Sequence, residues 1–194
     1  MINIQQFPVA EFRQTDFQSF INYWSRYYNY KPEHENEFYH IPIASTTLNR
    51  NDLLKLFEWK NGSVLSARKA TSFNDKIISR LSELNEIKSR GIESVKDVQK
   101  IRPDLSAIWL IFLTHIIDKQ SFPIFDMHVF RAYNYLTTNT ILEISNNDTK
   151  KLLQYDSYLS YYNALKPQIK DYKKWDEAMW AFGKFLSRYK PFNS

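Results

Sequence analysis

Asp126 is the residue of this chain whose surroundings best suit chemistry. It follows Phe122-Pro123 and precedes a segment with apolar residues at helical spacing. Because the residue before a proline is pushed out of the α region, this pattern predicts an extended loop that enters a helix at Asp126. A carboxylate there can act as an N-cap, which stabilises a helix by about 1 kcal/mol. The helix N-terminus also favours the ionised carboxylate, which could stabilise a developing positive charge or orient a water molecule.

Two polar residues follow in the first turns of the same predicted helix. His128 lies in the first turn, where packing or a local hydrogen bond competes with a functional role. Arg131 lies five residues after Asp126, offset by about 140° around the helix, and could contact a phosphate or an acidic neighbour. A third polar residue, His115, lies on an apolar helix and is expected to be a core histidine with its hydrogen bonds satisfied.

The sequence gives little sign of metal or thiol chemistry. Residues 33–40 contain glutamates and histidines, but their spacing matches no closed site, so we expect a solvated charged loop and no metal. The chain has no cysteine, which excludes disulfides, thiolate metal sites and iron–sulfur clusters. We therefore expect no cofactor.

Composition and patterning predict an all-α protein. The chain has 194 residues, 43% of them hydrophobic, three glycines and few alternating strand patterns. A loop is expected over 31–47, with a short strand at 37–43 as an option, and another over 139–148. The predicted helices are 16–29, 51–59, 72–89, 94–101, 104–117, 126–138, 148–165 (with a possible break near 156) and 172–188.

Charge and hydropathy bear on partners and location. The net charge is +5, and residues 98–194 hold 13 basic and 9 acidic side chains, so the basic excess lies in the half with Asp126. This favours a polyanionic partner. The apolar run 106–117 is too short for a membrane span of about 20 residues, and no leader pattern is visible. We expect a cytoplasmic protein without a membrane partner.

The aromatic residues are concentrated near both ends of the chain. Residues 23–30 and 155–162 are rich in tyrosine at helical spacing, which predicts core packing, with base stacking as the alternative. In the C-terminal helix, Trp175, Met179, Phe182 and Leu186 share one stripe, which predicts helix packing. Gly183 would cost about 1 kcal/mol in a helix interior relative to alanine. Its presence predicts the close approach of another backbone.

The segment 123–129, Pro-Ile-Phe-Asp-Met-His-Val, resembles a motif of the helix-hairpin-helix DNA glycosylases (the HhH-GPD superfamily), Pro-Val-Asp-Thr-His-Val, whose aspartate is catalytic. Upstream, residues 102–106 (Arg-Pro-Asp-Leu-Ser) stand where the family usually has Leu-Pro-Gly-Val-Gly. The resemblance covers residues 92–135 approximately, less than a quarter of the chain. It keeps the family spacing but lacks both hairpin glycines.

The resemblance implies one glycosylase-like helical domain over 1–194. Residues 48–138 would form a central lobe with the hairpin, while 1–47 and 139–194 would form a second lobe. It implies that DNA is the partner and that Asp126 assists hydrolysis of an N-glycosidic bond, as in base excision repair. The family's nucleophilic lysine would fall at Ala107 or Ile108, so the enzyme would be monofunctional. The residues expected to contact DNA or substrate are Ser106, Trp109, His128, Arg131 and Tyr133.

Two departures from the family pattern leave an alternative open. Asp104 and Ser106 replace the hairpin glycines, whose backbone N–H groups would approach a phosphate. Asp104 would bring a negative charge there, and we expect it to cap helix 104–117 instead. The alternative function is a non-catalytic helical module that binds nucleic acid or protein on the same scaffold.

Overall fold

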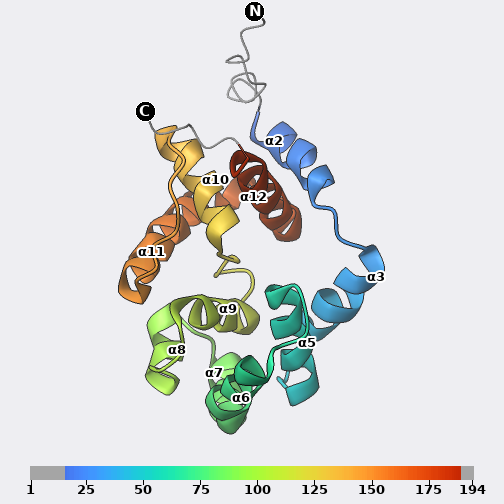
Figure 1. Ribbon diagram of the computed structural model, residues 1–194, viewed down its shortest axis with the longest axis vertical. Helices are drawn as coiled ribbons and strands as arrows, with labels where there is room; N and C mark the ends of the chain where they lie inside the picture. Colours follow the sequence, from blue (N-terminus) through green and yellow to red (C-terminus); the bar gives the residue numbers. More distant parts are fainter. Residues whose placement is uncertain (1–15, 189–194) are drawn as a thin grey trace, which may run out of the picture. The chain divides into compact units, whose positions relative to one another are not determined.

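The computed structural model describes residues 16–188, and this part of the chain is helical without a single β-strand (Figure 1). The all-α prediction is therefore confirmed. No helix within 16–188 combines the length and the apolar character that a membrane span requires. The described residues divide into two compact units: residues 16–29, 125–146 and 152–188 form unit 1, and residues 30–124 and 147–151 form unit 2.

Unit 1 is built around two helices in direct contact. These are α10 (Met127–Thr138) and α12 (Tyr172–Leu186), and α2 (Phe17–Trp24), followed by a 3-10 turn η1 (Ser25–Tyr27), also packs on α12. Most of α11 (Asp148–Leu165) completes the unit, followed by the 3-10 turn η4 (Lys166–Gln168). Three helices start at aspartate caps, Asp16, Asp126 and Asp171, each accepting backbone N–H bonds from the first turn.

The contact between α10 and α12 depends on Gly183. A Cβ atom built on this glycine would overlap the carbonyl oxygen of His128 and lie 2.9 Å from its Cα atom. The predicted close approach of a second backbone is thus confirmed. The predicted stripe of Trp175, Met179, Phe182 and Leu186 is also buried. The missing side chain at position 183 lets the first turn of α10 lie against α12.

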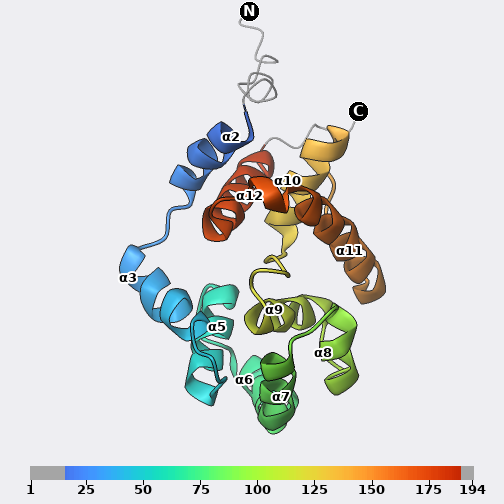
Figure 2. The same cartoon turned by 180° about the vertical axis from the view of Figure 1, so that it is seen from behind.

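Unit 2 contains the remaining helices (Figure 2), among them α9 (Ala107–Ile117), whose apolar side chains form part of its core. Leu110, Ile111 and Leu113 of α9 are almost fully buried, and the helix contacts α7 and α8. The apolar run of the sequence therefore forms a core helix. The elements of unit 2 are α3 (Pro32–Glu35), the π-helical turn η2 (Asn36–His40), α4 (Ile41–Ile43), α5 (Arg50–Asn61), α6 (Ala67–Lys76), η3 (Ile78–Arg80), α7 (Leu81–Arg90), α8 (Val95–Ile101) and α9 (Ala107–Ile117).

The expected hairpin segment consists of α8, a short turn over 102–106, and α9. Ser94 and Asp97 form a capping box at the start of α8. The expectation that Asp104 caps the next helix is wrong. Its carboxylate instead pairs with Arg102 at 2.9 Å and Lys76 at 3.5 Å, and α9 begins only at Ala107.

The loop predicted for 31–47 is wrong, as is the optional strand at 37–43. This segment folds into α3, η2 and α4. Pro32 occupies the first turn of α3, where a proline loses no helical hydrogen bond, so it starts this helical segment. Pro42 lies where the π-helical turn η2 passes directly into α4.

The single helix predicted for 72–89 is interrupted. Helix α6 ends at Lys76, a 3-10 turn follows, and α7 begins at Leu81. The Ser79 hydroxyl donates to the Asp75 carbonyl at the break, a local bond that competes with regular helix geometry. In contrast, α11 covers 148–165 as predicted, without a break near 156.

The borders of the units differ from those of the expected lobes. The resemblance implies that helix α10 belongs to the central lobe, but it packs on α12 and lies in one unit with the terminal helices. It implies that residues 30–47 belong to the terminal lobe, but η2 and α4 pack on α5. These assignments follow from long-range contacts, which sequence order does not reveal.

Candidate functional site

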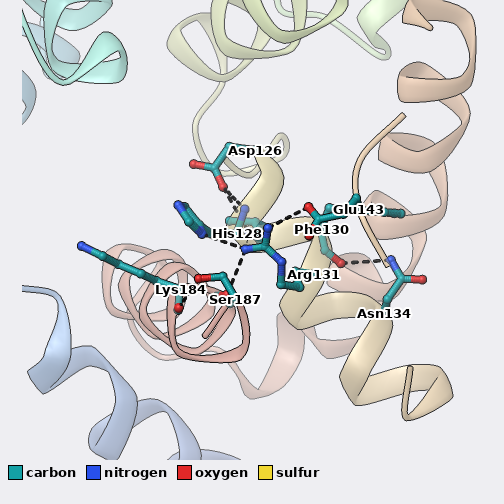
Figure 3. A network of polar contacts seen from close by, with 10 residues as sticks. Asp126, His128, Phe130, Arg131, Asn134, Glu143, Lys184 and Ser187 are labelled. Carbon is teal, nitrogen blue, oxygen red and sulfur yellow. Dashed lines mark hydrogen bonds and ion pairs between the residues drawn. The ribbon is translucent and has the colours of Figure 1, made fainter. Parts of the chain in front are cut away.

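Asp126 is the N-cap of α10, as predicted. Its Oδ1 atom accepts hydrogen bonds from the backbone N–H groups of His128 at 2.9 Å and Val129 at 3.0 Å. Figure 3 shows the other carboxylate oxygen turned away from these two bonds. Because Asp126 is half-buried and its neighbour Met127 is exposed, the carboxylate lies at the surface of unit 1.

Arg131 is buried beneath this cap, with an exposed fraction of 3%. Its Nη1 atom donates to the Gly183 carbonyl oxygen at 3.1 Å, and its Nη2 atom forms an ion pair with Glu143 at 2.7 Å (Figure 3). The sequence left open whether Arg131 contacts a phosphate or an acidic neighbour, and the structure shows an acidic neighbour, Glu143. The guanidinium joins α10, α12 and the segment after α10, so its described contacts are structural.

His128 is oriented by Arg131. The His128 Nδ1 atom lies 3.1 Å from Arg131 Nη1. A guanidinium has no acceptor, so Nδ1 must accept this bond and the neutral ring carries its proton on Nε2. The ring also packs edge-on against Trp180, with the ring centroids 5.2 Å apart.

Trp180 is the centre of a half-exposed aromatic platform. Besides His128, the ring of Tyr28 meets it edge-on at 5.3 Å. The amines of two lysines lie over these rings, Lys184 over Trp180 and Lys173 over Tyr28, each 4.6 Å from the ring centroid. The sequence points to His128, to Tyr28 among the tyrosines of residues 23–30 and to the C-terminal tryptophans as aromatics near Asp126, but it does not point to the two lysines. The spacing 173, 180, 184 on one helix was the available signal.

Tyr133 is the fourth unit 1 candidate, and it packs within an aromatic cluster. Its ring centroid lies 5.8 Å from that of Tyr158 and 5.3 Å from that of Tyr161. Burial raises the pKa of the Tyr161 phenol to about 12. These contacts agree with the core role predicted for the tyrosines at 155–162.

The remaining two candidates, Ser106 and Trp109, belong to unit 2. Ser106 is exposed and precedes the first residue of α9, while Trp109 packs edge-on against Phe57 at 5.0 Å. The backbone N–H of Ala107 donates to Asp148 at 3.2 Å. A carboxylate from α11 thus occupies the anion-favouring end of α9.

His115 is satisfied within the core, as predicted. Its Nδ1 atom lies 2.7 Å from the Phe122 carbonyl oxygen, so Nδ1 carries the proton. In the neutral ring, Nε2 accepts from the Tyr39 hydroxyl at 2.9 Å. His115 thereby fixes the loop after α9 to the core of unit 2.

The prediction of no metal site concerned residues 33–40 in particular. Here Glu35 accepts from Trp59 at 2.7 Å, Glu37 pairs with Lys55, and His34 stacks on Phe38. Across residues 16–188, no three side chains of the His, Cys, Asp or Glu types cluster in a way that could hold a metal ion.

Comparison of the chain with known protein families, with curated proteins and with solved structures found no match. The function must therefore be argued from the chemistry of the described residues. In unit 1 these provide a surface carboxylate at a helix N-terminus, an oriented histidine, and an aromatic platform with cations over its rings.

Proposed function

We propose that the protein acts on DNA and that Asp126 assists hydrolysis of the N-glycosidic bond of a modified or mismatched base. The observation that carries the proposal is the position of Asp126: its carboxylate caps α10 at the surface of unit 1, in the motif order of the resembled glycosylases. The α8–turn–α9 hairpin precedes it in the same order. A cytoplasmic base-excision hydrolase without cofactor fits this proposal.

The proposed step breaks the bond between the base and C1′ of the deoxyribose. Positive charge develops on the sugar as the base departs, and the Asp126 carboxylate stabilises it. Water adds its hydroxyl to C1′, and the departing base takes up a proton, so the products are the free base and an abasic sugar. Because a base must leave its stack to reach such a carboxylate, an aromatic surface beside Asp126 supports the proposal.

The test is a panel of duplexes with single modified or mismatched bases, assayed for abasic product. We expect wild type to release at least one base, and Asp126→Asn to lose that activity. The matched control is Asp171→Asn, because Asp171 caps α12 through Lys173 N–H at 3.0 Å and Lys174 N–H at 3.1 Å. Absence of abasic product on every substrate would refute the enzymatic proposal.

A second candidate function is a non-catalytic binding module, and one observation favours it. The Asp148 carboxylate engages the N-terminus of α9, where a phosphate would otherwise bind. Affinity for DNA measured over a range of salt separates the candidates, since phosphate contacts make binding fall steeply as salt rises. Absence of DNA binding at low salt would indicate a protein partner.

A further inference from the structure

The solvent-facing side of α12 carries cations and one tryptophan at helical spacing. Lys173, Trp180 and Lys184 are separated by seven and four residues, so they lie along one face, about 16 Å long. Glu177 shares this face and pairs with Lys173 at 3.7 Å. The opposite face is the buried stripe described above. Two cations and one carboxylate leave the face with a net positive charge.

Two other elements hold the tryptophan ring of this face. Tyr28, which follows the 3-10 turn η1, and His128 of α10 both meet Trp180 edge-on. Because Arg131 orients His128 through Nδ1, the platform is coupled to the buried network below it. In Figure 3 the His128 ring and the Lys184 side chain extend to the same side of Arg131. The aromatic surface is thus fixed in place before a ligand binds.

We propose that this face, defined by Lys173, Tyr28, Trp180, Lys184 and His128, binds an unpaired polynucleotide strand. Exposed bases stack on aromatic rings whatever their identity, while lysines contact the phosphates between them. A paired duplex keeps its bases inside and reaches the platform only where a base has left its stack. Asp126 precedes His128 by two residues in the chain. A strand held on this face would therefore bring a base near the Asp126 carboxylate. In that last point the inference rests on the proposed function.

The platform can be tested by fluorescence anisotropy on the full chain with three labelled strands of equal length: oligothymidylate, oligouridylate, and an abasic strand of the same charge. We expect the thymidylate strand to bind about tenfold or more tightly than the abasic strand, the range expected for stacking one base. Uridylate binding equal to thymidylate would identify the ligand as any unpaired strand; weaker uridylate binding would identify it as DNA. Equal binding of thymidylate and abasic strands would overturn the proposal.

Variants separate the platform from general charge. Trp180→Ala should remove the preference for bases over the abasic strand, whereas Trp180→Phe should keep most of it. Lys184→Gln should lower the salt dependence by about one phosphate contact. Lys96→Gln, an equal charge change on the exposed side of α8, is the matched control. An equal loss in Lys96→Gln and Lys184→Gln would overturn the proposal, because net charge alone would then explain binding.

The two proposals can fail separately. Strand binding that depends on Trp180 but yields no abasic product would leave the platform intact and refute the glycosylase. Base release by the wild type, together with equal binding of the thymidylate and abasic strands, would refute the platform and leave Asp126 as proposed. If Trp180→Ala does not fold, the platform is still tested by comparing thymidylate and abasic strands on the wild type and on Trp180→Phe.

Discussion

Asp126 has an observed role as a helix cap and a proposed role in catalysis, and a pair of substitutions can separate the two. As a cap it provides one acceptor, Oδ1, for two backbone N–H groups of α10. An asparagine can provide the same acceptor but carries no charge. A catalytic carboxylate needs the charge, because it must stabilise a cation or bind a water molecule.

We therefore expect Asp126→Ala to lower the free energy of unfolding by about 0.5–2 kcal/mol, and Asp126→Asn to lower it much less. Urea unfolding monitored by circular dichroism gives both values. If Asn keeps the stability but abolishes base release, the charge is catalytic. If Asp126→Ala is as stable as wild type, the capping role is contradicted.

The contact between α10 and α12 requires a residue without a side chain at position 183. Helix propensity alone predicts that Gly183→Ala stabilises the protein by about 1 kcal/mol. The Cβ atom would instead overlap the His128 backbone, which can move only with α10. The two effects have opposite signs, so the sign of the measured change is decisive.

For Gly183→Ala we expect a net loss of about 1–3 kcal/mol, as for other overpacked sites. The substitution also displaces the carbonyl that accepts from Arg131. A useful comparison is Ala181→Gly in the same helix, where a propensity loss of about 1 kcal/mol is joined by the loss of a buried methyl group but no backbone is displaced. Thermal and urea unfolding of both variants measure these changes; a more stable Gly183→Ala would contradict the close approach.

At the scale of elements, Asp148 links the start of α11 to the start of α9. The Lys151 ammonium group and then the Ala107 N–H group donate to its carboxylate, and these bonds hold the pKa of Asp148 below its ordinary value of 3.8. A lowered folded-state pKa adds stability above the unfolded value, about pH 3.8, and this stability is lost as the pH falls through the folded value.

Asp148→Asn should consequently be less stable than wild type near neutral pH, and the difference should shrink towards zero at about pH 2.5. Urea unfolding at about pH 6 and about pH 2.5 tests this. Asp156→Asn, an exposed position later in α11, should change stability little at either pH. A difference between Asp148→Asn and wild type that is constant with pH would show that the charge of Asp148 is not involved.

At the scale of the whole molecule, three of the buried tyrosines, Tyr155, Tyr158 and Tyr162, lie in unit 1, whereas Tyr39 lies in unit 2. Burial, reinforced by the negative charge of Asp176, raises the pKa of Tyr155 and Tyr158 well above 10.0. With Tyr161, these residues lie in unit 1. Because the pKa of these phenols is higher in the folded state than in the unfolded state, their contribution to the free energy of unfolding is fully present below pH 10. It is lost as the pH rises through the pKa values of the folded state.

Unit 1 should therefore unfold before unit 2 as the pH rises above 10. The five tryptophans report on each unit separately when labelled with fluorine, since Trp24, Trp175 and Trp180 lie in unit 1 and Trp59 and Trp109 in unit 2. Fluorine NMR should show the unit 1 signals changing first, and Tyr161→Phe should shift that change to higher pH. Simultaneous loss of all five signals would mean that the units unfold as one.

The local features of this protein can be predicted from its amino-acid sequence. An aspartate before an apolar segment predicted the helix start at Asp126, and the apolar run 107–117 predicted a core helix, because caps and helical periodicity act over a few residues. The sequence also predicted that position 183 needs a small residue, because glycine is unfavourable inside a helix unless a neighbouring group leaves no space for a side chain.

Which of these local features contact one another depends on the tertiary structure. It paired Arg131 with Glu143 and Gly183, placed the Asp148 carboxylate on α9, and assembled Tyr28, His128 and Trp180 into one surface. It also moved α10 from the expected central lobe to the unit of the terminal helices. These contacts join residues far apart in the chain, and their formation depends on how whole helix faces pack, which no local spacing encodes.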